Sequence, residues 1–174
     1  MQQAAPARYV PPHRRDQEPV QQARNAPLYT HYRQHSQNAC AVEAIRMAYE
    51  TTAGYELNRG ELKDFMVEKG IYDVDRGTFF HALDRVFDEF RMHYEAGKGE
   101  PGDVARALAK GGVVLLETTT EAGAGHVLVL DALMGQEEGR YRFQIRDPGG
   151  FNVENVDTTD PRLQRATGRF WRVW

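Results

Sequence analysis

The hydrophobic pattern of this chain changes its period near residue 113, and this change limits the fold more than any other feature of the sequence. Before that point apolar residues recur at helical spacing, which predicts helices over 40–52, 59–70, 78–90 and 103–110. After it, short apolar or alternating runs predict strands over 113–118, 126–133, 141–146, 151–156 and, as an edge strand, 170–174. Helices followed by an antiparallel sheet define the α+β class, and we expect the helices to pack on that sheet.

Local signals indicate where the helices begin and end. Asn38 is the expected N-cap of the first helix, and Gly54 is its expected stop. Asn58 and Glu61 have the spacing of a capping box at the start of the second helix. Alanines at helical spacing predict that the first helix packs closely and lies centrally. The phenylalanine stripe over 79–90 predicts a core face of the third helix rather than a cofactor site.

Composition divides the chain into a tail and one domain. Residues 1–27 are rich in Gln, Ala, Pro and Arg and hold five of the eight prolines. Such a segment buries too little apolar surface to offset its ordering entropy, so we expect it to be disordered or loosely docked. It is either a solvated end or an arm for export, targeting or partner binding. Residues 28–174 are enough for one domain with its own core.

Charge and hydropathy limit which binding partners and which cellular compartment we expect for this chain. The formal net charge is −3 and no basic stripe lies outside the N-terminal segment, so we expect no nucleic-acid partner. No apolar run approaches the roughly 20 residues of a membrane span. No apolar segment follows Met1, so we expect a cytoplasmic protein, or one exported without a cleavable secretory signal peptide.

Cys40 is the single cysteine, and it lies where a polar loop ends and the first helix begins. One cysteine excludes an internal disulfide and a zinc site built on paired cysteines, and we expect no metal or cofactor. A thiol at a helix start gains thiolate character from the positive end of the helix dipole. Cys40 is therefore a candidate nucleophile, and the alternative is a buried, inert cysteine.

His126 and Asp147 are the candidate partners of that thiol. His126 opens an apolar strand directly after two glycines, and Asp147 ends the next strand before Pro-Gly-Gly. If the two strands form a hairpin, its start and its end lie side by side, which places a carboxylate next to an imidazole. The aspartate would then orient the ring and stabilise the imidazolium. The alternatives are a histidine that is merely hydrogen-bonded at the end of a strand and an aspartate that only forms a turn.

Gln34 lies six residues before Cys40 and completes the candidate site. Its side-chain amide could donate to an oxyanion together with the Cys40 backbone N–H, with Gln37 as the rival donor. The four residues form an ordered set of amide donor, thiol, histidine and aspartate. A zinc enzyme that uses Cys40, His126 and Asp147 as ligands fits their helix-start and strand-end positions less well than a triad does.

The chain resembles papain-like cysteine peptidases, and within them the C39 family of bacteriocin-processing peptidase domains and their stand-alone relatives. The resemblance is carried by Gln34, by residues 40–47, by Gly-His-Val-Leu-Val-Leu over 125–130 and by Asp-Pro-Gly over 147–149. It covers roughly residues 29–174. It implies a papain-like fold in which a central Cys-bearing helix packs on the sheet, with Gln34 as oxyanion donor, Cys40 as nucleophile, His126 as base and Asp147 as orienter.

The resemblance implies a thiol protease that hydrolyses a peptide or isopeptide bond in a protein or peptide substrate. Family members usually carry Asp-Cys-Gly at the nucleophile, where this chain has Ala39-Cys40-Ala41, so cleavage of double-glycine leader peptides is not part of this expectation. Deamidation or acyl transfer by the same residues is an alternative, and so is a non-catalytic interaction module. A proline-rich tail before a protease-like domain is also a layout of bacterial effectors.

Overall fold

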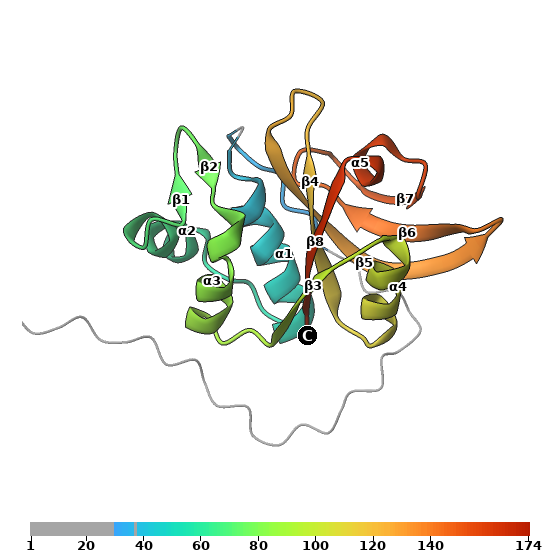
Figure 1. The fold of residues 1–174 in the computed structure, drawn as a ribbon. Helices are drawn as coiled ribbons and strands as arrows, with labels where there is room; N and C mark the ends of the chain where they lie inside the picture. The colour runs from blue at the N-terminus through green and yellow to red at the C-terminus, as the bar shows by residue number, and fades with distance from the viewer. Residues whose placement is uncertain (1–29, 37) are drawn as a thin grey trace, which may run out of the picture.

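The computed structural model describes residues 30–36 and 38–174, and it confirms the α+β class (Figure 1). The segment expected as a tail, residues 1–27, lies outside the described residues. The elements that precede the main sheet are α1 (Cys40–Ala53), α2 (Arg59–Glu68), β1 (Tyr72–Asp73), β2 (Gly77–Thr78), the 3-10 helix η1 (Phe80–Ala82) and α3 (Asp84–Glu89).

The second half of the chain forms a six-stranded antiparallel sheet with the order β3-β8-β4-β5-β6-β7. Its strands are β3 (Tyr94–Lys98), β4 (Val113–Thr119), β5 (Gly125–Glu137), β6 (Arg140–Arg146), β7 (Val153–Asp157) and β8 (Ala166–Val173). Helix α4 (Pro101–Ala109) precedes β4, and the short helix α5 (Pro161–Gln164) precedes β8. The hairpin that the sequence predicted is formed by β5 and β6.

Each face of the sheet carries its own hydrophobic core. Leu115 and Val127 belong to the core that contains α1, whereas Leu116 and Leu128 belong to the core that contains α4. Successive side chains of a strand point to opposite faces, so β4 and β5 are buried on both sides and have continuous apolar runs. Helix α1 packs against β4, β5 and α2, which confirms its predicted central position.

The predicted order of the strands is wrong at one edge of the sheet. No strand was predicted between the helices expected over 78–90 and 103–110, but this stretch contains the edge strand β3. Strand β8 lies between β3 and β4 instead of forming an edge. Gly97 explains the error, because glycine is typical of loops but here allows a close approach. A Cβ at Gly97 would overlap the ring of Phe170 on β8, so this strand position requires glycine.

The third predicted helix is also interrupted. Thr78 belongs to the β1–β2 hairpin, and the helical turns that follow are η1 and α3 rather than one continuous helix. The Asp73 side chain accepts hydrogen bonds of 2.9 Å from the backbone N–H groups of Asp75 and Arg76, which closes the turn between β1 and β2. Phe87 is fully buried, as predicted for the core face.

The helix caps agree with the sequence in two of three cases. Gly54 ends α1 with a φ of 81°, and the Asn58 side chain accepts from the N–H groups of Gly60 and Glu61. Asn38 is not the cap of α1, since Ala39 occupies that position. The Asn38 amide instead donates to the carbonyls of Val74 and Asp75, at 2.9 and 3.0 Å. It therefore ties the loop before Cys40 to the β1–β2 turn.

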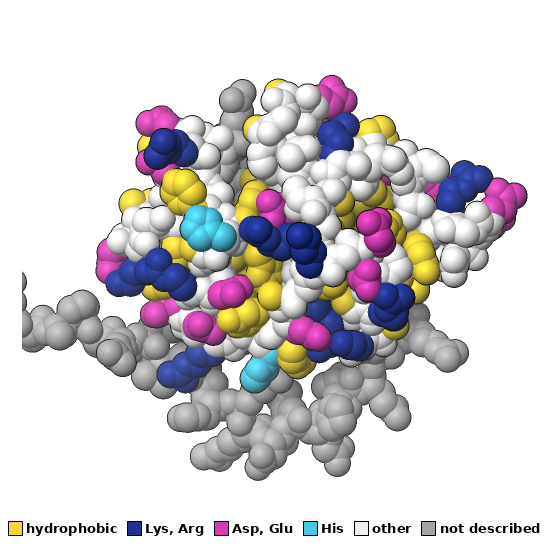
Figure 2. Space-filling view, viewed as in Figure 1, with side chains coloured by type: hydrophobic (Ala, Val, Ile, Leu, Met, Phe, Trp, Pro, Cys, Tyr) yellow, Lys and Arg dark blue, Asp and Glu magenta, His cyan; other side chains and the backbone are white. Residues whose placement is uncertain are grey.

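The surface over α3, β3 and α4 carries charges of both signs among apolar side chains (Figure 2). In the ranges 30–36 and 38–174, every helix is too short or too polar to cross a lipid bilayer. This agrees with the expectation that the domain has no membrane span.

Candidate active site

Cys40 is the first residue of α1 and is 4% exposed. Ala39 and Ala41 on either side of it are also buried, so only small side chains flank the thiol. The N-cap residue contributes no side-chain hydrogen bond to the first turn of this 14-residue helix. The thiol therefore lies at the positive end of a 14-residue helix whose N-cap residue, Ala39, has no side chain that could cap the first backbone N–H groups.

His126 lies at the start of β5, opposite Thr118 of β4. Its ring atom Nε2 is 2.7 Å from Oδ1 of Asp147, and the Cys40 side chain lies near enough to the ring to raise the pKa of His126. Because Nε2 faces the carboxylate, Nδ1 is the ring nitrogen that remains for the thiol. The fold thus brings together the helix start, the strand start and the strand end that the sequence singled out.

The two ionisable partners shift in opposite directions. Burial lowers the pKa of His126, but the hydrogen bonds and negative charges of Asp147 and Cys40 outweigh burial and raise this pKa from 6.5 to about 9. Burial raises the pKa of Asp147, but the His126 ring, the Gly149 amide and Arg162 together hold it below its ordinary value of 3.8. At neutral pH the pair is therefore imidazolium and carboxylate.

The turn over 147–150 is part of the site as well as a reversal of the chain. Asp147 Oδ1 accepts a second hydrogen bond of 2.8 Å from the Gly149 N–H, and the Asp147 carbonyl accepts one of 2.8 Å from Gly150. A Cβ at Gly149 would lie 3.7 Å from His126 Cε1, so this glycine packs against the ring edge. The predicted turn is confirmed, and its backbone orients the carboxylate.

The segment before Cys40 is fastened to the same turn. The Gln34 backbone N–H donates to the Pro148 carbonyl at 2.8 Å, and His31 Nε2 donates to the Asp147 carbonyl at 2.8 Å. Oε1 of Gln34 is buried, and the residue as a whole is half-buried. The structure therefore places Gln34 beside the Asp147 turn. Gln37, the rival donor, lies outside the described residues.

Sequence reasoning missed Arg146, which ties the sheet to the Cys40 helix. Arg146 is fully buried, and its guanidinium forms a two-pronged ion pair with Asp131, with Nε–Oδ2 at 2.8 Å and Nη2–Oδ1 at 2.5 Å. It also donates to Thr51 Oγ1 of α1 at 2.9 Å and to the Thr30 carbonyl at 2.8 Å. Because Arg146 precedes Asp147, this pair fixes the end of β6 against α1. A lone arginine at a strand end gives no signal of such burial.

His31 and Arg162 were also missed. His31 stood in a polar segment with no feature that set it apart from the other histidines. Arg162 approaches the second oxygen of Asp147, with Nη1 3.4 Å from Oδ2. Asp160 before Pro161 is the typical start of a helix, with the cap followed by proline, and this signal could have predicted α5. It could not have indicated where the Arg162 side chain lies.

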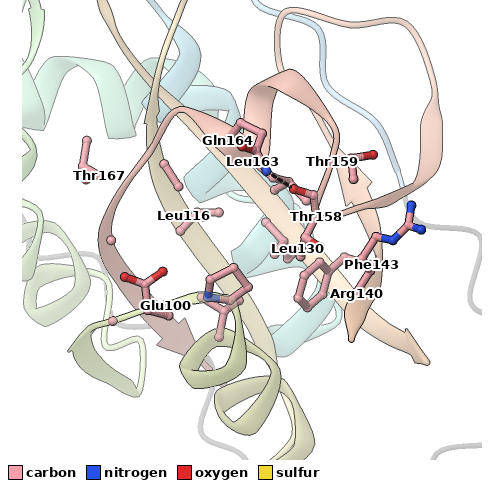
Figure 3. Close-up of a pocket in the computed structure, with 15 residues that line it drawn as sticks. Glu100, Leu116, Leu130, Arg140, Phe143, Thr158, Thr159, Leu163, Gln164 and Thr167 are labelled. Carbon is pink, nitrogen blue, oxygen red and sulfur yellow. Dashed lines mark hydrogen bonds between the residues drawn. The ribbon is translucent and has the colours of Figure 1, made fainter. Parts of the chain in front are cut away.

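A cavity of about 480 Å³ lies away from Cys40, His126 and Asp147, on the face of the sheet opposite to α1 (Figure 3). Its floor includes Leu116, Leu130 and Phe143, which belong to the core that contains α4, whereas Cys40 belongs to the core on the α1 side. The catalytic candidates therefore do not line this cavity. In the part of the chain that the structure describes, no three His, Cys, Asp or Glu side chains are grouped to hold a metal ion.

No protein-family model matches the sequence, and no curated protein matches it either. Solved structures do match. The peptidase domain of Streptococcus ComA, a bifunctional ABC transporter involved in quorum sensing, is 12% identical with a TM-score of 0.65, over 83% of this chain and 97% of that domain. A double-glycine-motif protease of an AMS/PCAT transporter, solved with the leader peptide, is 11% identical with a TM-score of 0.60, over 83% and 89%. A C39-like peptidase from Bacillus anthracis is 13% identical with a TM-score of 0.57, over 84% and 94%.

These matches confirm the predicted fold class. The chain has the papain-like α+β fold of C39 peptidase domains, with the Cys40 helix packed on the antiparallel sheet. The alignments span most of each matched domain, so the likeness extends beyond a shared motif.

Proposed function

We propose that this chain is a cysteine peptidase that hydrolyses a peptide or isopeptide bond in a protein or peptide substrate. The observation that carries the proposal is the series Cys40, His126 and Asp147, in which the imidazole bonds the carboxylate and lies next to the thiol, and both raise its pKa. The fold supports it, since the structurally similar domains are described as peptidases or proteases.

The series performs the two half-reactions of a thiol protease. The Cys40 thiolate attacks the substrate carbonyl carbon, and the His126 imidazolium then gives its proton to the leaving amine as the C–N bond breaks. Water attacks the resulting thioester while His126 accepts a proton from it, which releases the carboxylic acid and the thiol. Asp147 holds the ring orientation and stabilises the imidazolium in both steps.

The oxyanion of each tetrahedral intermediate needs donors close to Cys40. In our proposal these are the Cys40 backbone N–H, at the start of α1, and the Gln34 side-chain amide. Two observations support Gln34: its backbone is fastened to Pro148, next to Asp147, and its Oε1 is buried rather than solvated.

The substrate is set by groups other than the triad. The AMS/PCAT protease was solved with a leader peptide, but alanines flank the thiol of this chain. We therefore extend the proposal to protein or peptide amides and not to double-glycine leaders. The proline-rich composition of residues 1–27 also supports a role as a bacterial effector, with host proteins as the substrates to test.

The test uses the fact that Cys40 is the only cysteine, so that iodoacetamide reports on one thiol. We expect the folded chain at neutral pH to react about tenfold faster than the same chain unfolded in urea, because an imidazolium stabilises the thiolate. His126→Asn should abolish this acceleration, and His81→Asn, a change at an exposed histidine, should leave it unchanged. Labelling that speeds up only on unfolding would instead indicate an inert cysteine.

A second experiment tests the hydrolysis itself. Covalent probes built on short peptides and on ubiquitin should label the wild type and not Cys40→Ala. Analysis of the products then separates peptide hydrolysis from deamidation, in which ammonia leaves, and from acyl transfer, in which an amine replaces water. Hydrolysis of a responsive substrate that persists in Cys40→Ala would contradict the proposal.

A further inference from the structure

The carboxylate of Asp147 is held from two sides. Its Oδ1 faces His126 Nε2 at 2.7 Å, and its Oδ2 faces Arg162 Nη1 at 3.4 Å. We propose that Arg162 is a positioning residue of this site, which fixes Asp147 in the orientation that His126 requires. This inference rests on the proposed function, because it assigns Arg162 a role in the same site.

Arg162 is itself held rigidly enough to act in this way. Its guanidinium makes two hydrogen bonds to Glu154, at 3.1 and 2.9 Å, and two to Asp160, at 3.0 and 2.9 Å. The planar guanidinium presents its N–H donors in fixed directions, so bonds to two carboxylates determine where the remaining direction points. That direction is toward Asp147, and the Arg162 side chain is 22% exposed.

The backbone of Arg162 is tied to the strand position opposite His126. The Asp160 side chain accepts from the Arg162 N–H at 2.8 Å and caps α5, and the Arg162 carbonyl accepts from Thr118 Oγ1 at 2.6 Å. Thr118 is buried and pairs with His126 in the β4–β5 register. Through its backbone carbonyl, Arg162 therefore contacts Thr118, which lies across from His126. Through its side chain, it contacts Asp147, which bonds the His126 ring.

The charges around Asp147 make the effect of losing Arg162 specific. The ionisable groups that face this carboxylate are His126 from β5 and Arg162 from α5, with Asp160 near it; Glu154 of β7 shares the Arg162 guanidinium. His31 bonds the Asp147 backbone carbonyl and not its side chain. Without the guanidinium, Oδ2 of Asp147 loses its partner on the α5 side, so the carboxylate turns more easily about its bond to Cβ and holds the His126 ring less firmly.

The test follows the His126 imidazolium in Arg162→Met, by NMR titration and by the pH dependence of Cys40 alkylation. In the wild type its pKa is about 9. We expect the midpoint to fall toward 6.5 and alkylation at neutral pH to slow about tenfold, because an unheld carboxylate supports the imidazolium less. Loss of a nearby positive charge alone would raise the midpoint. A higher or unchanged midpoint therefore overturns the proposal.

Matched variants sharpen this experiment. Arg162→Lys keeps the charge without the planar fork, so its midpoint should lie between those of the wild type and Arg162→Met; a wild-type midpoint would show that charge alone acts and would overturn the positioning role. Arg140→Met, a change at an exposed arginine paired with Glu138, should alter neither readout. If Arg162→Met does not fold, Arg162→Gln replaces it; its midpoint should also fall, and an unchanged or higher midpoint there would contradict the inference.

These readouts need no substrate, so they distinguish a failure of the proposed function from a failure of the role of Arg162. If alkylation of the wild type does not depend on His126, the proposed function fails. If it does depend on His126 and the Arg162 variants titrate like the wild type, only the role of Arg162 fails.

Discussion

The substitution Asp147→Asn separates the charge of this residue from its hydrogen bond to His126. An asparagine amide oxygen can accept from His126 Nε2 and from the Gly149 N–H, as the carboxylate oxygen does now at 2.7 and 2.8 Å. The variant therefore keeps the hydrogen bond that orients the ring, but it loses the negative charge that stabilises the imidazolium, and its amide nitrogen faces Arg162 Nη1 where Oδ2 now accepts. Asp147→Ala, the matched variant, loses both.

The size of the effect follows from the titration of His126. The rise of its pKa from 6.5 to about 9 corresponds to about 3 kcal/mol of preference for the imidazolium over the neutral ring. Asp147 and Cys40 share this contribution, and the hydrogen bond that Asp147 accepts is the largest of the effects that raise the pKa. A neutral amide accepts from an imidazolium less strongly than a carboxylate does, so loss of the Asp147 charge weakens this bond as well as the attraction between the charges. The substitution should therefore remove about half of the preference and place the midpoint near pH 8.

The assay is the rate of Cys40 alkylation as a function of pH, joined by hydrolysis of any substrate that the probe experiments identify. Asp147→Asn should move the alkaline limb from about pH 9 to about pH 8 and keep most of the activity at neutral pH. Asp147→Ala should reduce the rate at neutral pH by about 10²-fold or more, since the ring is no longer oriented. An alkaline limb in Asp147→Asn at the wild-type position would refute the electrostatic reasoning, and wild-type rates in Asp147→Ala would refute the orienting role.

Three further predictions concern stability, and urea unfolding measures each. The folded pKa of His126 lies above its unfolded value, so its stabilising contribution is complete below pH 6.5 and is lost as the pH rises toward 9; a His126→Gln variant should lack this dependence. Arg146→Met should cost about 3 kcal/mol because it leaves the buried Asp131 without its partner, and the double variant with Asp131→Leu should recover part of that loss. Gly112→Ala should destabilise by about 2 kcal/mol or more, since this residue has a φ of 86° and a Cβ would collide with the Val173 carbonyl. Gly111→Ala, with a φ of 90° but no neighbouring atom within 4 Å, should cost less, and equal losses would contradict the collision.

The elements that the sequence predicted well are those whose signals are local. The switch from helical spacing to apolar strand runs near residue 113 predicted the α+β class. A helix buried on one stripe repeats its apolar residues at helical spacing, whereas a strand buried on both faces is apolar throughout. Gly54 and Asn58 marked helix ends through backbone geometry and a short-range hydrogen bond. The β5–β6 hairpin predicted that His126 and Asp147 are neighbours, since hairpin pairing follows from sequence adjacency.

The features that were missed depend on contacts between distant segments. Strand β3 pairs with β8, which lies far from it in the sequence. Gly97 of β3 is typical of a loop, and the reason for a glycine there is the Phe170 ring on β8. Asn38 is a residue type that often caps helices, but its side chain donates instead to two carbonyls of the β1–β2 turn. Arg146 is a charged residue that only a fully buried partner, Asp131, allows inside the core.

The Asp147 turn shows why an Asp-Pro-Gly-Gly motif does not by itself form an active site. Asp-Pro-Gly-Gly predicts a turn, and its own backbone supplies only the bonds from Gly149 and Gly150. The other constraints come from elsewhere: His31 and Gln34 bond its carbonyls from the segment before α1, and Arg162 reaches its second carboxylate oxygen from α5. The Gly149 N–H holds Oδ1 from within the turn and Arg162 holds Oδ2 from α5, so the direction of the carboxylate depends on the packed domain as well as on the turn. A chain with the same four residues but without these partners would still reverse direction, and only the Gly149 N–H would then hold the carboxylate toward His126.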